Sequence, residues 1–450
     1  MRGSKWWGKA LCYVDTTIVL CCLTAMGITT IIQTDRQLAE AERAHAEMSS
    51  ALNSVMNFAA ALDGIPAELI PDIRRAFEVE AREKASAIKS YQAAKDGDCS
   101  QLMELAGADL GRRLIAARVC KGFSQKELAR KLGLKEQAIQ RWEADHYRSI
   151  TIANFQSVSR ALGLRLFFDT SSPEPHDWAP TFETPRSDAS KVLRHAKKRG
   201  WIEGDDPDRL LAKRISEHVQ KHGTPSLLRT GLNSHAENSD WSLIAWKAQV
   251  TWVAEQRIKS LKQTFQPLDF SWLSDLVRLS TAADGPKRAK EFLADKGIVL
   301  VVEPQIQGMK VDGAAFLVDG VPVIGLTLLR DSIDNFWFTL LHELGHVFLH
   351  YRSGLNSGFF DDAEARNVDE LEEQADRFAR NLIVSDEAWR KSPARIAKSP
   401  AIVESVARKL GISPAILFGR IRMERGRYDL FSNKIGRGTV RRQFPEYEGC

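Results

Sequence analysis

Residues 334–350 read DNFWFTLLHELGHVFLH, and this stretch predicts an apolar helix that carries a metal-binding motif. His342 and His346 are four positions apart, so both side chains project from the same face of a helix. Two imidazoles at that spacing can bind one tetrahedral zinc ion through bonds of about 2.0–2.1 Å. The surrounding residues are apolar, so these polar groups need a partner, and a metal supplies one. We therefore predict a zinc site on this helix.

Glu343 directly follows the first histidine, at the position where a carboxylate serves as general base in zinc peptidases. A catalytic zinc ion also needs a third protein ligand and one open coordination position. Glu372 is the best candidate, because Asp376 follows it by four positions on the same face of the predicted helix LEEQADRFARNLIV. Asp376 is suited to accept a hydrogen bond from a ligand histidine. Glu373 is the alternative ligand, although it points about 100° away from that face.

The residues before this helix predict a small β-sheet. After Gly297 the chain contains aliphatic runs at 298–302, 313–318 and 322–328, and the last two are separated by the turn pair Asp319-Gly320. A small sheet followed by a metal-binding helix is typical of an α+β domain. We expect a peptide substrate to add as a strand along the edge at 322–328.

A second motif precedes the metal site in the sequence. Ser124 and Glu127 have the spacing of a helix capping box, and Gly133 is suited to the turn into a second short helix at 135–143. Leu110 and Leu114 indicate an earlier helix that ends near Gly122. Short helices joined by a glycine turn are typical of a helix-turn-helix fold.

The charge of this segment is compatible with DNA binding. Between 109 and 148 there are ten Lys or Arg against five acids, a local excess as large as the net charge of +5 of the whole chain. Glu136 and Glu143 lie in or near the second helix, and they leave open the alternative of a protein-interaction module.

The segment 293–426 resembles the ImmA/IrrE family of metallo-endopeptidases. The matching stretches, in this order, are DGAAFLV, the motif helix quoted above, EEQADRFARNLIV and ARKLGISPAILFGRIRME. The resemblance implies a zinc ligand set of His342, His346 and Glu372, with Glu343 as the catalytic residue. Members with known roles cleave a partner protein, often a repressor, and so release transcription.

Three further residues near the motif have their own interpretations. Gly345 is expected to leave room between the two histidines, at some cost in helix propensity. His350 is interpreted as a structural or substrate-cleft histidine rather than a ligand. Gln374 departs from the family pattern, since many relatives carry a second glutamate there, and this weakens any role for a second acid.

Residues 122–147, GFSQKELARKLGLKEQAIQRWEADHY, resemble the XRE or lambda-repressor-like helix-turn-helix, and the closing helix NFQSVSRALGL fits the same pattern. The resemblance places Gln125 and Lys126 near the phosphate backbone. It also directs toward the major groove four side chains, some of which can pair with base edges: Lys135, Gln137, Gln140 and Arg141.

A chain of 450 residues is too long for one core, so we expect several domains. The predicted fold class is multidomain and mainly α, with an all-α helix-turn-helix domain, a helical region and an α+β zincin-like peptidase domain. The predicted segments are an apolar extension at 1–33, a helical hairpin at 34–100, the helix-turn-helix domain at 101–169, a linker at 170–186, the helical region at 187–296 and the metallopeptidase-like domain at 297–450.

The N-terminal run at 16–32, TTIVLCCLTAMGITTII, is open to three interpretations. It is a misassigned or extended start, with translation beginning at Met26, or a short membrane anchor, or part of the fold. We favour the first, because Asp15 adjoins the run and several threonines dilute it. A membrane partner is therefore not expected.

The six cysteines show no CxxC pair and no repeated spacing, so we expect no disulfide framework and a reducing, cytoplasmic environment.

These observations predict a cytoplasmic transcriptional regulator with its own zinc endopeptidase. Its expected partners are double-stranded DNA and a regulatory protein substrate or a toxin, and a homodimer is compatible with the helical hairpin. The alternatives are a DNA-binding antitoxin or autorepressor whose peptidase-like domain is not catalytic, and a membrane-tethered regulator.

Overall fold

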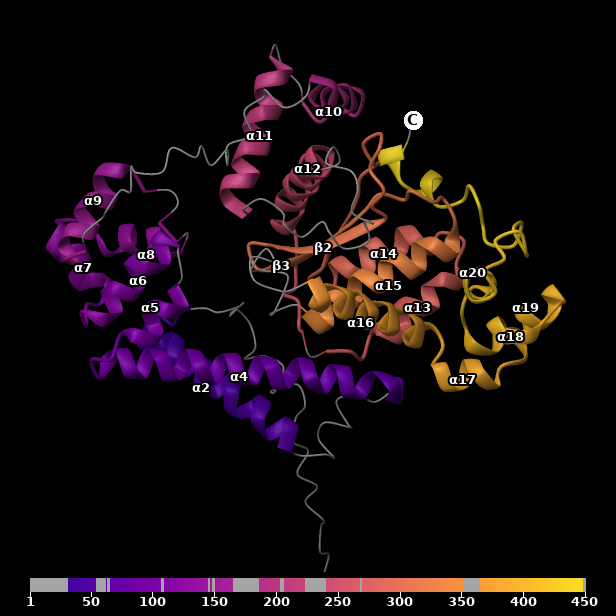
Figure 1. The fold of residues 1–450 in the computed structure, drawn as a ribbon, viewed down its shortest axis with the longest axis horizontal. Helices are drawn as coiled ribbons and strands as arrows, with labels where there is room; N and C mark the ends of the chain where they lie inside the picture. Colours follow the sequence, from indigo (N-terminus) through magenta and orange to yellow (C-terminus); the bar gives the residue numbers. More distant parts are fainter. Residues whose placement is uncertain are drawn as a thin grey trace, which may run out of the picture.

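The computed structural model describes residues 31–53, 62, 65–106, 109–144, 146–147, 150–164, 186–202, 206–222, 240–267, 269–350 and 365–447. Helices dominate these residues, and their strands form one small sheet (Figure 1). The predicted fold class is confirmed. The run at 16–32 and the linker at 170–186 fall outside the described residues, except for 31, 32 and 186. No helix in the described part of the chain is long and apolar enough to cross a membrane.

The N-terminal helices α2 (Asp35–Asn53) and α4 (Ile70–Lys95) pack against each other as a hairpin. Apolar side chains at spacings of three and four residues bury one face of α2, including Ala44 and Met48. The short helix η1 (Ala67–Leu69) precedes α4.

Helix α4 belongs to two hydrophobic cores. Near its start, Ile73 and Phe77 join the core that contains the C-terminal helices, whereas Tyr91 and Ala94 near its end join the core of the helix-turn-helix segment. In Figure 1, α4 accordingly extends below both groups of helices. The hairpin therefore connects the helix-turn-helix segment to the core that contains the C-terminal helices.

The helix-turn-helix segment is a compact helical bundle whose helices are α5 (Ser100–Ala106), α6 (Leu110–Cys120), α7 (Gln125–Leu132), α8 (Glu136–Ala144) and α9 (Ile152–Ala161). Both halves of the predicted capping box form, since Ser124 accepts from the backbone of Glu127 and the Glu127 side chain accepts from the backbone of Ser124. Gly133 ends α7 in the left-handed conformation, with φ of 67°. Leu110 is 55% exposed and does not contribute to the core.

Cys99 and Cys120 are paired as a disulfide that joins the start of α5 to the end of α6, with their Cα atoms 5.7 Å apart. The sequence predicted no disulfide framework, and it did not predict this single pair. The two residues are 21 positions apart in a spacing that matches no motif. Only the packing of α5 against α6 brings them together.

The middle of the chain forms α10 (Arg186–Lys198), α11 (Pro207–His222) and α12 (Asp240–Ile258). Their apolar residues pack on one face of the sheet. Trp201 and Trp246 are buried there, and their indole nitrogens donate to the side chain and the backbone carbonyl of Glu303, respectively.

The sheet contains β1 (Val299–Val302), β2 (Gly313–Val318) and β3 (Val321–Leu326) in the order β1-β3-β2. β3 runs parallel to β1 and antiparallel to β2, and both residues of the predicted turn, Asp319 and Gly320, have positive φ. β3 is the central strand, so the prediction that a substrate adds at 322–328 is wrong. Of the two outer strands, β2 contacts α15 (Ile333–His350), the helix that contains the metal motif.

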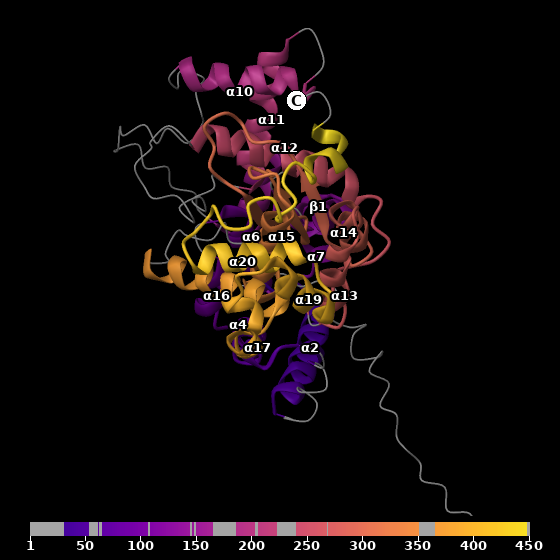
Figure 2. The same ribbon diagram turned by 90° about the vertical axis from the view of Figure 1, so that its right-hand side faces the viewer.

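The C-terminal helices, grouped together in Figure 2, share one hydrophobic core with the opposite face of the sheet. They are α13 (Leu273–Arg278), η3 (Leu279–Thr281), α14 (Gly285–Ala294), α15 (Ile333–His350), α16 (Ala365–Ile383), α17 (Asp386–Lys391), α18 (Pro393–Ile396), α19 (Pro400–Leu410) and α20 (Pro414–Glu424), followed by η4 (Arg441–Gln443) and η5 (Pro445–Tyr447). Residues of α13 and α14, which the sequence placed before the peptidase-like domain, share the core of α15.

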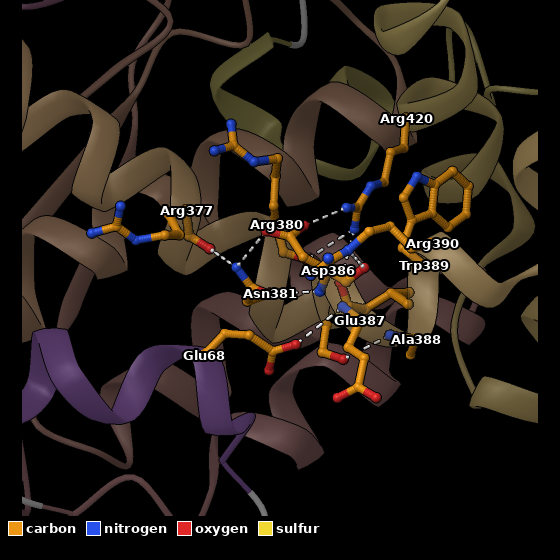
Figure 3. A network of polar contacts seen from close by, with 12 residues as sticks. Glu68, Arg377, Arg380, Asn381, Asp386, Glu387, Ala388, Trp389, Arg390 and Arg420 are labelled. Carbon is orange, nitrogen blue, oxygen red and sulfur yellow. Dashed lines mark hydrogen bonds and ion pairs between the residues drawn. The ribbon is translucent and has the colours of Figure 1, made fainter.

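A polar network holds the end of α16 in place (Figure 3). The backbone N–H of Asp386 donates to Asn381 at 2.7 Å, and Arg420 of α20 donates to the carboxylate of Asp386 at 2.7 Å. Glu68 of η1 accepts from the backbone N–H of Glu387 at 3.1 Å. These contacts tie α16 to α17, α20 and the N-terminal hairpin, so the position of α16 is determined from several sides.

Candidate metal centre and nucleic-acid interface

Helices α15 and α16 lie against each other, and their close approach depends on Gly345. A Cβ atom at this position would lie 3.0 Å from the Cα atom of Ala375. A larger residue would therefore separate the helices. The glycine makes room for α16 rather than for the space between the two histidines, which corrects the expectation drawn from the sequence.

Three side chains from these helices converge on one point: His342 and His346 of α15, and Glu372 of α16. The two Nε2 atoms are 3.1 Å apart, and the carboxylate oxygens of Glu372 lie 3.2 Å from Nε2 of His342 and 3.3 Å from Nε2 of His346. Ligand atoms at 2.0–2.1 Å from a tetrahedral zinc ion are about 3.4 Å apart, so the spacing fits such an ion. Two nitrogens and one carboxylate are also a donor set of catalytic zinc sites.

The electrostatics of this cluster favour a positive charge at its centre. Burial disfavours the charged form of His342, but hydrogen bonds to Asp376 and Glu372 outweigh this effect and raise its pKa to about 10. Burial raises the pKa of Glu372, yet the two histidines lower it well below its ordinary value. The three residues are therefore suited to hold a cation between them, and zinc and a proton would compete for that place.

Asp376 lies where the sequence placed it, beside the first histidine. Its Oδ1 atom is 2.9 Å from Nδ1 of His342, so Nε2 of that ring is directed toward the other ligand atoms. Arg380 contacts the other carboxylate oxygen at 3.5 Å. Glu373, the alternative ligand, is exposed and is not part of the cluster.

Two residues that the sequence did not assign to the metal site, one of them interpreted as a structural or substrate-cleft histidine, complete the surroundings of His346. Nδ1 of His346 is 3.0 Å from Nδ1 of His350, and Nε2 of His350 is 3.0 Å from Oε1 of Gln374. Burial and the neighbouring His346 lower the pKa of His350 to about 3, so its ring is neutral. His350 is therefore a partner of a ligand rather than a ligand, and only its position four residues after His346 indicated this.

Glu343 is buried beside the cluster and is held by strand β2. Its Oε1 atom lies 2.8 Å from the position that a Cβ atom at residue 313 would occupy, so the carboxylate fits there because residue 313 is glycine. The backbone of Ala315 donates a hydrogen bond to Glu343. Burial raises the pKa of this carboxyl group, and the two neighbouring histidines partly oppose the shift. A buried carboxylate with a raised pKa is suited to accept and return a proton.

Comparison with protein families matches two segments of the chain. Residues 294–421 match the IrrE N-terminal-like domain, and residues 114–168 match a helix-turn-helix domain. The chain carries both domains. No curated protein and no solved structure matches the chain. The IrrE N-terminal-like domain includes every residue of the cluster described above, and its family points to a metallopeptidase-like fold.

The helix-turn-helix domain presents its second motif helix, α8, at the surface. Gln125 does not point outward as expected, because its amide donates to Glu143 at 2.8 Å and the side chain is half-buried. The other residues that the sequence assigned to DNA are exposed: Lys126, Lys135, Gln137, Gln140 and Arg141.

One of the two acids that weakened the DNA-binding interpretation is absent from this surface. Glu143 is fully buried and forms two charge-assisted hydrogen bonds with Arg118, at 2.5 and 2.8 Å. Tyr147 also lies within 3.3 Å of this carboxylate. Glu136 stays exposed and accepts from Gln140 at 3.1 Å. The negative charge of Glu143 is therefore neutralised in the core of the helix-turn-helix domain.

Proposed function

We propose that this protein is a DNA-binding transcriptional regulator with a zinc-dependent endopeptidase, which hydrolyses a peptide bond in a regulatory partner protein such as a repressor. The observation that carries this proposal is the convergence of His342, His346 and Glu372 beside the buried carboxylate of Glu343. The helix-turn-helix domain in the same chain favours regulation over general digestion.

Each residue of the centre has one task in this proposal. When bound, a zinc ion supplies a Lewis acid and lowers the pKa of a water molecule toward about 7. His342, His346 and Glu372 hold the ion, and Asp376 orients the first histidine. Glu343 takes up the proton of the attacking water and later returns it to the leaving amine.

The place for the substrate follows from strand β2. Within the described residues β2 pairs with β3 only, so no other strand pairs with its outer edge there. The backbone of Ala315 in this strand interacts with the carboxylate of Glu343. A peptide that adds as a strand along β2 would bring its scissile bond to the general base.

Metal analysis tests the first part of the proposal. We expect the protein purified in the presence of zinc to contain about one zinc ion per chain, and a strong chelator to remove it, because the part of the chain that the structure describes contains one set of three converging ligands. Elemental analysis by mass spectrometry measures the ratio. A protein that stays free of metal after incubation with zinc would contradict the endopeptidase proposal.

The DNA-binding part is tested on α8. We expect the double variant Gln140→Ala, Arg141→Ala to bind its preferred DNA about tenfold more weakly or worse, since each bidentate base contact contributes about 1–3 kcal/mol. Fluorescence anisotropy with a DNA site selected by the wild-type protein measures the affinity. The matched control is Gln156→Ala, Arg160→Ala, which removes the same two residue types from exposed positions of α9. Equal binding by both double variants would make α8 a protein-interaction helix.

A further inference from the structure

The second metal-ligand histidine is supported in a different way from the first. His342 has a carboxylate partner, Asp376, whereas the partner of His346 is a second imidazole, His350. A carboxylate can only accept a hydrogen bond from Nδ1, which leaves Nε2 free for the metal. An imidazole can either donate or accept, so His350 supports His346 only if its own tautomer is determined.

Gln374 determines that tautomer through its amide orientation. The amide nitrogen of Gln374 lies 3.3 Å from Oε1 of Glu370, and a carboxylate oxygen there accepts a hydrogen bond. The amide oxygen therefore faces the other way, toward Nε2 of His350 at 3.0 Å. An amide oxygen is an acceptor only, so Nε2 of His350 carries the proton.

The tautomer of His350 in turn determines the tautomer of His346. When the ring of His350 carries its single proton on Nε2, its Nδ1 atom is an acceptor. Nδ1 of His346, 3.0 Å away, must then be the donor. Its Nε2 atom is left with a free lone pair, and this atom is the one that faces Nε2 of His342 at 3.1 Å and Glu372 at 3.3 Å.

We infer that Gln374 and His350 are positioning residues that act in series to fix His346 in its metal-binding tautomer. This inference rests on the proposed function, because it assigns the support of one ligand in the same centre. It gives Gln374 a role that does not depend on negative charge: its amide oxygen accepts a hydrogen bond from His350, and its amide nitrogen donates one to Glu370. The centre then has one ligand histidine supported by a charged acceptor and one supported by a neutral relay.

Zinc affinity of the full-length protein tests the relay, measured by competition with a chromophoric chelator. Gln374→Met keeps the side-chain length but removes the acceptor, and we expect it to weaken zinc binding about 10–100-fold, as for other partners of metal ligands. Gln374→Glu retains an acceptor oxygen and should restore most of the affinity. Gln256→Met, the same change at an exposed position of α12, should leave it unchanged.

A double-variant cycle tests whether Gln374 acts through His350. We expect Gln374→Met to cause no further loss of zinc affinity in a chain that already carries His350→Phe. That chain lacks the imidazole through which Gln374 acts on His346. Two independent, additive losses would overturn the series arrangement. Equal zinc binding by wild type and Gln374→Met would overturn the relay alone, whereas a wild type that binds no zinc would overturn the proposed function as well.

Nuclear magnetic resonance of protein labelled with ¹⁵N-histidine gives a readout that a purely structural role would not change. In the zinc-loaded wild type, we expect His350 to carry its proton on Nε2, and in Gln374→Met to lose this preference. The wild-type measurement needs no variant, so it remains decisive if His350→Phe does not fold. A proton on Nδ1 of His350 in the wild type would overturn the inference.

Discussion

Glu343→Gln should abolish peptide hydrolysis while leaving zinc binding almost unchanged. The amide has the size of the carboxylate but cannot take up a proton, and general acid–base catalysis by a single group contributes about 100–10,000-fold to rate. Zinc affinity should change little because Glu343 is not one of the three converging ligands. Cleavage of a peptide mixture, followed by mass spectrometry, measures the rate, and the chelator competition measures zinc.

The matched control for this variant is Glu291→Gln, which makes the same change at an exposed position of α14. It should cleave like the wild type. If Glu343→Gln also cleaves like the wild type, Glu343 is not the general base. If neither the wild type nor any variant cleaves, while zinc and DNA still bind, the alternative of a regulator with a non-catalytic peptidase-like domain is favoured. A cellular protein that accumulates uncleaved with Glu343→Gln would identify the substrate.

Glu143→Gln should destabilise the helix-turn-helix domain by about 3–5 kcal/mol, because it leaves the buried guanidinium of Arg118 without its counter-charge. The pair joins α6 to α8, so its loss affects the helix that we assign to DNA. Amide hydrogen exchange measures the local opening of these helices. We expect exchange in α6 and α8 to become more than about a hundredfold faster, and DNA binding to weaken with it.

Two comparisons separate charge burial from a general effect of substitution. Glu104→Gln, at an exposed position of α5, should leave exchange unchanged. The double variant Arg118→Met, Glu143→Leu removes both charges, and it should recover much of the lost stability because no unpaired charge remains. Exchange in α15, which lies in a different core, should be the same in all these variants. If exchange in α8 of Glu143→Gln stays as slow as in the wild type, the buried ion pair contributes little to the stability of this domain.

Features that depend on residues close together in the sequence were predictable. The capping box at Ser124 and the hairpin turn at Asp319-Gly320 involve residues at most three positions apart, and backbone geometry leaves few ways to satisfy them. The two ligand histidines also belong to this group, since a spacing of four on a helix determines a shared face. The same reasoning supplied Glu372 and Asp376 as a pair, and the structure brings both to the histidines.

Several features that the sequence did not predict correctly depend on contacts between elements. The strand at 322–328 has no local mark that distinguishes a central strand from an edge strand, because strand order depends on how the whole sheet assembles. Burial of Glu143 requires Arg118 on another helix, 25 positions away. The pairing of Cys99 with Cys120 likewise depends on the packing of α5 against α6.

Helix α15, which contains the metal motif, separates what the sequence determines from what depends on the tertiary structure. The sequence by itself determined that α15 forms, that it is buried and that it presents two imidazoles side by side, because apolar content and a spacing of four act within one helix. Only the tertiary structure decided which ring nitrogen faces the metal position. That choice depends on Asp376 for one histidine, and on His350 and Gln374 for the other. A hydrogen bond forms only at about 3 Å. Gln374 comes that close to the end of α15 because Gly345 lets the two helices meet.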